Sequence, residues 1–150
     1  MALPPCGLYK TTIPIGPVET DRLVYFHNHG DPGPGIYPPE SWAHNRASFS
    51  KRGVTLEEEG IADTLEPLPP EGLYRVTEEF TCCAKECRTF PVDLMVQLGY
   101  DATATPILFV PRWTSDGLDI PDRGHKLDDG RMEMLAPLKV AAMPKAGDLH

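Results

Sequence analysis

Apolar and polar residues alternate most clearly between residues 92 and 100. Val92, Leu94, Val96, Leu98 and Tyr100 alternate there with Asp93, Met95, Gln97 and Gly99. A period of two predicts a β-strand with one apolar face. The short segment 101–105 leads from it into the apolar run 107–110, so we predict a β-hairpin whose second strand is buried on both faces. This hairpin is the expected centre of the fold.

Weaker patterns predict the other elements. Strands are expected at 8–15, 22–28, 73–80 and 138–142, where β-branched and aromatic residues gather. Helices are expected at 39–51, which begins with Pro39 and ends before Gly53, and at 129–135 after the capping residue Asp128. Segments 29–35 and 55–72 are rich in Gly or Pro and predict a loop and a semi-rigid connector. No internal repeat is evident.

These elements predict a strand-rich α+β fold. We expect a small, twisted, mostly antiparallel sheet or partial barrel, with one or two short helices and long Pro/Gly loops. Residues 1–71 would form an N-terminal region with an extended arm, a strand pair and a short helix, packing on a compact β-rich unit at 72–150. A chain of 150 residues is long enough to bury one core, so we expect a single cooperative domain overall.

The composition limits the possible partners. The formal charge of −8 disfavours binding to a phosphate backbone, so we expect no nucleic-acid partner. The most apolar run, 107–110, is far too short to cross a bilayer, so we expect no membrane association. No basic leader precedes a long apolar stretch at the N-terminus, which predicts a cytoplasmic protein whose four Cys are reduced thiols or metal ligands.

A His-x-His pair follows the strand predicted at 22–28. The side chains of His27 and His29 point the same way at a strand end, so both could bind one metal ion, with Asp31 as a possible carboxylate ligand. The alternative is structural, with the two imidazoles hydrogen-bonded to the backbone of the loop.

The residues around this pair resemble the metal motif of the JAMM-type isopeptidases. In that family a strand that ends in His-x-His-Pro is followed by a Ser and, three residues later, by an Asp ligand. Here the stretch LVYFHNH at 23–29 is followed by a Pro/Gly loop, Ser41 and a predicted helix. Gly30 stands at the Pro position and His44 at the Asp position. The resemblance implies a small zinc-dependent hydrolase that uses His27 and His29.

A second group of possible ligands is the cysteine cluster at 82–87. The spacing of Cys83 and Cys87 suits zinc, whereas Cys82 would face the opposite way on a strand. Cys6, His27 or His29 could complete such a site and tie the two halves of the chain together. The thiols could instead be buried and idle, or form a disulfide.

No arrangement typical of nucleophilic catalysis or phosphate binding is present in the sequence. We therefore predict a non-enzymatic interaction or structural protein that is a subunit of a larger or homo-oligomeric assembly, with a protein or a second copy as its partner. Trp42 and Trp113 are expected to be core or interface anchors. The alternative function is the zinc-dependent hydrolase.

Overall fold

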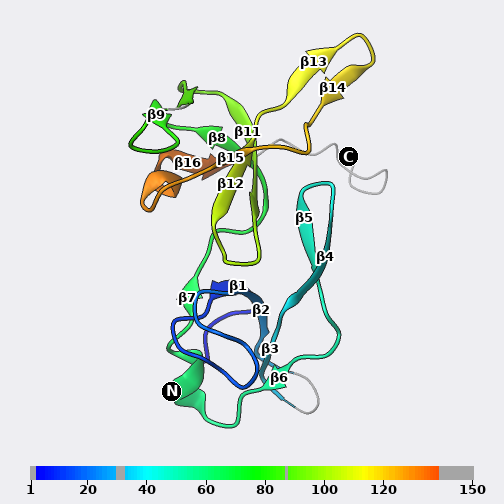
Figure 1. Cartoon of the computed structure of the whole chain (residues 1–150), viewed down its shortest axis with the longest axis vertical. Coiled ribbons are helices and arrows are strands. Elements are labelled where there is room, and N and C mark those ends of the chain that lie inside the picture. The colour runs from blue at the N-terminus through cyan, green and yellow to red at the C-terminus, as the bar shows by residue number, and fades with distance from the viewer. Residues whose placement is uncertain (1–2, 30–32, 87, 139–150) are drawn as a thin grey trace, which may run out of the picture.

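The structure is a computed structural model that describes residues 3–29, 33–86 and 88–138. Its strands form two five-stranded sheets and three two-stranded ladders, and every pairing in them is antiparallel. The two larger sheets lie one above the other along the long axis of the molecule (Figure 1). The expectation of a strand-rich, antiparallel fold is confirmed, and within the described residues neither sheet closes into a barrel.

The first sheet has the order β6-β3-β2-β1-β7 and the second has the order β15-β12-β11-β8-β16. The strands of the first sheet are β1 (Gly7–Lys10), β2 (Leu23–His27), β3 (Gly35–Tyr37), β6 (Val54–Thr55) and β7 (Glu66–Pro67). Those of the second are β8 (Gly72–Val76), β11 (Met95–Tyr100), β12 (Pro106–Phe109), β15 (His125–Lys126) and β16 (Leu135–Pro137). The remaining strands are β4 (Pro39–Ala43), β5 (Arg46–Phe49), β9 (Phe80–Thr81), β10 (Thr89–Phe90), β13 (Arg112–Thr114) and β14 (Gly117–Asp119). The described residues also form one α-helical turn, α1 (Glu59–Ala62), and one 3-10 turn, η1 (Arg131–Met134).

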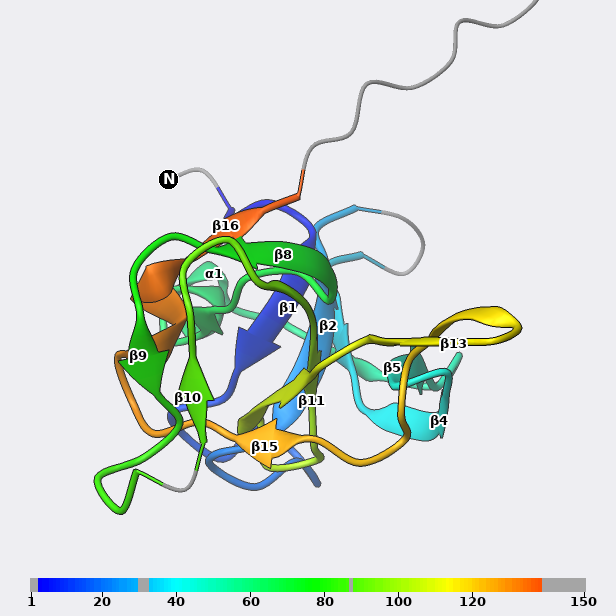
Figure 2. The same ribbon diagram turned by 90° about the horizontal axis from the view of Figure 1, so that it is seen from above.

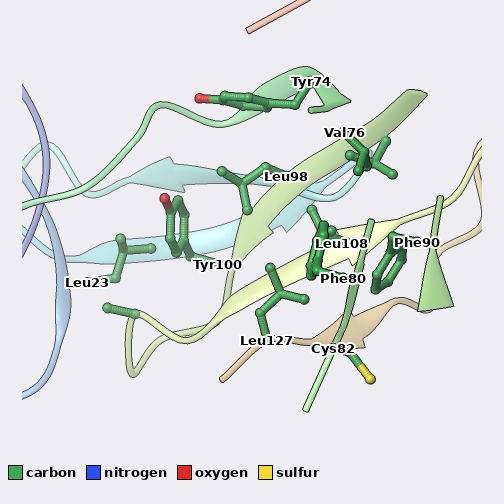
Figure 3. Close-up of a cluster of buried hydrophobic side chains, with 12 residues drawn as sticks. Leu23, Tyr74, Val76, Phe80, Cys82, Phe90, Leu98, Tyr100, Leu108 and Leu127 are labelled. Atoms are coloured by element: carbon green, nitrogen blue, oxygen red, sulfur yellow. The ribbon is translucent and has the colours of Figure 1, made fainter. Parts of the chain in front are cut away.

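The predicted central hairpin is confirmed. Strand β11 pairs with β12, and Leu98 lies opposite Leu108. Both side chains are fully buried in the core of the second sheet, together with Val76 (Figure 3). Val96 is fully buried in the same cluster. Burial of each such side chain contributes roughly 1.5–3 kcal/mol.

The two sheets are built in the same way, so the expectation that the chain has no internal repeat is wrong. In both sheets the fourth strand along the chain lies at one edge, followed in space by the third, the second, the first and then the fifth. Each half inserts a hairpin between its third and fourth sheet strands, β4–β5 in the first and β13–β14 in the second. Each half also places one short helix, α1 or η1, before its last strand.

Residue identities and hydrogen bonds follow the same repeat. Residues 4–10 read PPCGLYK and residues 69–75 read PPEGLYR. In both, the Tyr hydroxyl donates a hydrogen bond to the carbonyl four residues earlier, Tyr9 to Pro5 at 2.7 Å and Tyr74 to Pro70 at 2.6 Å. These tyrosines stand opposite Val24 and Val96 in their sheets, which makes the two valines equivalent.

The later parts of the two halves match as well. Residues 52–56 read RGVTL and residues 123–127 read RGHKL. Gly53 and Gly124 each lie where an added Cβ would clash with a carbonyl of the neighbouring strand, that of Ile36 or Leu108. Residues 65–68 read LEPL and residues 135–138 read LAPL. The N–H of Leu68 donates to the Leu8 carbonyl and that of Leu138 donates to the Leu73 carbonyl, at 3.0 Å in both cases. The chain is therefore a tandem duplication, here called module 1 (residues 4–68) and module 2 (residues 69–138).

The hairpin β4–β5 extends from module 1 onto module 2 (Figure 1). At its tip, Asn45 Nδ2 donates to Gln97 Oε1 at 2.9 Å, and Gln97 Nε2 donates to the His44 carbonyl at 3.0 Å. The indole N–H of Trp42 donates to the Tyr100 carbonyl at 2.8 Å. These contacts cover the outer face of β11, and Gln97 is accordingly 7% exposed.

The expected helix at 39–51 is wrong, because these residues form β4 and β5. The two residues between the strands, His44 and Asn45, have φ angles of 52° and 65°, which a right-handed helix does not allow and a two-residue hairpin loop of the I′ kind requires. The strand expected at 73–80 is divided between β8 and β9, which belong to different sheets. The strand expected at 138–142 lies, apart from Leu138, outside the described residues.

Candidate metal centre

The pairing of β1 with β2 brings Cys6 beside the two predicted histidines. Gly7 lies opposite Phe26, so the residue before β1 and the residue that ends β2, Cys6 and His27, are neighbours across the ladder. His29 follows two residues later on the same side of the chain. The His27 and His29 rings lie with their centroids 4.0 Å apart.

The three side chains have a spacing that suits a metal ion. Cys6 Sγ lies 3.7 Å from His27 Nδ1 and 3.8 Å from His29 Nδ1. All three ligand atoms lie within 4.8 Å of one another. With Zn–S at about 2.3 Å and Zn–N at about 2.0–2.1 Å, a tetrahedral site separates its S and N ligands by roughly 3.6 Å. The group could therefore hold a metal ion with little movement.

Asn28 supports this arrangement, although its role was not predicted. Its backbone N–H donates to Cys6 Sγ at 3.3 Å, and its side-chain amide donates to the Pro4 carbonyl at 3.1 Å. Its Oδ1 accepts hydrogen bonds from Cys6 Sγ at 3.2 Å and from His29 Nδ1 at 2.8 Å. A metal bound at Cys6 Sγ would displace the thiol proton, so metal affinity should weaken as the pH is lowered. A metal bound at His29 Nδ1 would leave the imidazole proton on Nε2. The N–H bond to the sulfur would stabilise the thiolate that a metal needs.

The group is open on one side. Cys6 and His27 are partly buried, whereas His29 is exposed. Three protein ligands with solvent on one side leave room for a fourth ligand from water or from another molecule.

The other predicted ligands lie elsewhere. Cys82 is buried and Cys83 partly buried in the core region of module 2, with their sulfur atoms 3.6 Å apart. Neither belongs to the group of Cys6, His27 and His29, the one set of three convergent ligands among the described residues. Cys87 and Asp31 lie outside the described residues, so zinc binding by Cys83 with Cys87 stays a prediction.

Module 2 has other residues at the positions of these ligands. Because Gly7 and Gly72 pair with Phe26 and Leu98, the positions of Cys6, His27 and His29 correspond in module 2 to Glu71, Gly99 and Asp101. The same sheet order and register form without the thiol and imidazoles. Their presence in module 1 alone points to a function rather than to a structural requirement of the sheet.

The structural context of the isopeptidase resemblance is not present. Ser41 and His44 lie on the β4–β5 hairpin that docks on module 2, where the resemblance required a helix after the loop. A cavity of about 570 Å³ does lie between this hairpin and module 2, beside Trp42, Tyr100 and Phe109. None of the residues lining it belongs to the Cys6, His27 and His29 group.

Comparisons with protein-family models, curated proteins and solved structures found no match to this chain. Among the described residues, no helix has the length and apolar character needed to cross a membrane.

Proposed function

We propose that this chain is a non-enzymatic, zinc-binding interaction protein in which Cys6, His27 and His29 hold the ion. The observation that carries the proposal is the convergence of one thiol and two imidazoles within 4.8 Å at the start of β1 and the end of β2. A mixed set of sulfur and imidazole nitrogen ligands favours zinc over magnesium or calcium, which prefer oxygen. A reducing, cytoplasmic location would keep Cys6 available as a ligand.

Zinc titration tests the proposal directly. Protein purified under reducing conditions should take one equivalent of Zn²⁺ from a chromophoric chelator, and Cys6→Ser and His27→Ala should each weaken binding at least tenfold. His44→Asn is the matched control, because it removes an exposed imidazole outside the group while keeping a residue that tolerates positive φ.

A zinc site at the cysteine cluster would contradict this proposal. Zinc binding that survives Cys6→Ser and is lost on Cys83→Ser would move the site to the cluster at 82–87 and overturn the proposal.

A zinc-dependent hydrolase remains the second candidate, because the exposed side of His29 leaves a position for a reacting water. It predicts that zinc-loaded protein hydrolyses a panel of ester, amide and isopeptide substrates. Turnover that disappears in Cys6→Ser would favour the hydrolase, and its absence at full zinc occupancy favours the interaction protein.

A further inference from the structure

A cavity of about 360 Å³ lies in module 2 at the base of the β13–β14 hairpin. This hairpin extends away from the body of the molecule in both views, and its Trp113 is 81% exposed (Figures 1 and 2). The volume lies within the range of small-molecule sites, roughly 300–1,000 Å³. The cavity is lined by segments that are distant in the sequence: Arg88 before β10, residues 110–112 at the start of the hairpin, Pro121 and Arg123 after it, and His125 in β15.

The lining concentrates basic groups in a chain that is acidic overall. Arg88, Arg112 and Arg123 are three of the eight arginines of the chain, and His125 adds a fourth basic group. Among the described residues no Asp or Glu lines this cavity, although the formal charge of the chain is −8. A cleft lined by groups of one charge sign focuses the electric field and attracts ions of the opposite sign. The lining therefore favours an anion.

One buried ring orients two of the basic groups. Phe90 is fully buried, and the central guanidinium carbon of Arg88 lies 6.0 Å from the centroid of its ring. The His125 ring contacts Phe90 edge to face, with the centroids 5.9 Å apart and the ring planes at 75°. Because both groups rest on a rigid aromatic side chain, they have less conformational freedom to lose when a ligand binds.

Arg112 is oriented by the hairpin itself. Its Nε donates a hydrogen bond to Asp119 Oδ2 at 3.1 Å, from β13 to β14. Within the described part of the chain the two terminal nitrogens of Arg112 form no hydrogen bond, so they can donate two parallel hydrogen bonds to an oxyanion. Asp119 offsets only one positive charge, and the cavity keeps the charge of two arginines in addition to His125.

The equivalent place in module 1 has different chemistry. The hairpins β4–β5 and β13–β14 each carry a Trp that pairs across a two-residue loop, so their residues can be matched. On this basis Ser41 of module 1 corresponds to Arg112. In the matching Arg-Gly segments, Val54 corresponds to His125. A hydroxyl and an apolar side chain thus stand where module 2 has two basic groups, so this set of basic residues is particular to module 2.

We propose that the cavity binds the phosphate groups of a small organic phosphate through Arg88, Arg112 and Arg123, with His125 as a further hydrogen-bond donor. The planar fork of a guanidinium group matches the geometry of phosphate oxygens, and several such groups together suit a ligand with more than one negative charge. The partner is a small molecule rather than a nucleic acid, because the net charge of the chain repels a long polyanion. The site is separate from the candidate metal centre in module 1.

Isothermal titration calorimetry with inorganic pyrophosphate tests the proposal. The full chain, freed of metal with a chelating resin, should bind one equivalent of pyrophosphate, with an affinity that falls as the NaCl concentration rises. Arg112→Gln and Arg123→Gln should each weaken binding at least tenfold. Arg75→Gln is the matched control, because it removes an exposed arginine of module 2 that lies outside the cavity and, like Arg112, is paired with an acid, Asp93.

A parallel titration with citrate separates phosphate recognition from general anion binding. Tighter binding of pyrophosphate than of citrate supports the proposal, whereas equal affinities would show a general anion site and overturn it. A chain that binds no pyrophosphate at millimolar concentration would overturn it as well. So would an equal loss of affinity in Arg75→Gln and in the two cavity variants. The zinc titration is independent of these outcomes, because the two sites share no residue.

Discussion

At the scale of single residues, the two modules place different chemistry at equivalent positions. Cys6 in module 1 belongs to the candidate metal centre, whereas Glu71 in module 2 accepts the backbone N–H of Ala47 at 3.0 Å. Burial raises the pKa of Glu71 above its ordinary value, and the Ala47 hydrogen bond and nearby Arg46 only partly offset this. The ionised carboxylate therefore carries an energetic cost in the folded state.

This cost predicts a pH-dependent effect of Glu71→Gln. The folded-state pKa lies above the unfolded one, so the stabilising contribution of the protonated acid is present below the unfolded pKa and is lost as pH rises through the folded pKa. Glutamine keeps an oxygen that can accept from Ala47 and has no charge to desolvate. We expect the variant to gain stability relative to the parent between pH 4 and pH 7, measured by urea unfolding at both values. An equal difference at the two pH values would contradict this interpretation.

At the scale of elements, the β4–β5 hairpin depends on its docking site. Its sequence has Pro at the start, Trp42 and Ala43 inside and basic residues after it, which is a pattern typical of a helix. Docking on β11 supplies hydrogen bonds to Gln97 and Tyr100 that a helix in the same place would not make. Tertiary contact therefore overrides the local preference.

Gly99→Ala tests this dependence. The added methyl would lie 2.6 Å from the Asn45 carbonyl, so the hairpin must shift, at a cost of about 1–3 kcal/mol in the free energy of unfolding. Gly60→Ala in α1 is the control, since no atom outside its immediate surroundings lies within 4 Å of the new methyl. The control should be neutral or slightly stabilising, because Ala favours a helix over Gly by about 1 kcal/mol. If the two substitutions changed the free energy of unfolding equally in chemical denaturation, the close approach of the Asn45 carbonyl to Gly99 would make no contribution to stability.

At the scale of the whole molecule, residues of module 1 complete the core cluster of module 2, while module 1 also has a buried cluster of its own around Phe26 and Ile36. Leu23 of module 1 is fully buried in the same cluster as Tyr100 and Leu108 of module 2 (Figure 3). Leu8, Phe49 and Leu68 of module 1 pack against that cluster. The covalent link between the modules is the short Pro-rich segment around Pro69 and Pro70. Side-chain packing and the β4–β5 hairpin supply the non-covalent contacts that hold the modules together.

We therefore expect one cooperative unfolding transition, as predicted for residues 1–71 and 72–150 together. Phe26→Ala in module 1 should cost about 3–5 kcal/mol and Leu98→Ala in module 2 about 2–5 kcal/mol. Each should shift the whole transition, followed by far-UV circular dichroism and by tryptophan fluorescence in parallel. Two separate transitions, each moved by only one of the substitutions, would instead show that the modules unfold independently.

Much of the strand pattern could be predicted from the sequence because alternation is a local property. The hairpin of β11 and β12 and the strand that carries His27 are confirmed on this basis, whereas Val92 lies outside β11 and is exposed. The repeat was not recognised because its identical residues lie in short motifs such as GLY, RG and L-x-P-L, separated by segments that differ in length and composition. Only the matching sheet orders and registers make these motifs equivalent.

The sequence by itself determined which residues face the same side of a strand, and so placed His27 and His29 together. Only the tertiary structure decided that Cys6 joins them, that Glu71 and Gly99 stand in the corresponding place of module 2, and that one hairpin is covered while the other is exposed. The physical reason is that the direction of a side chain follows from the backbone period over a few residues, whereas contacts between distant residues follow from strand register and packing.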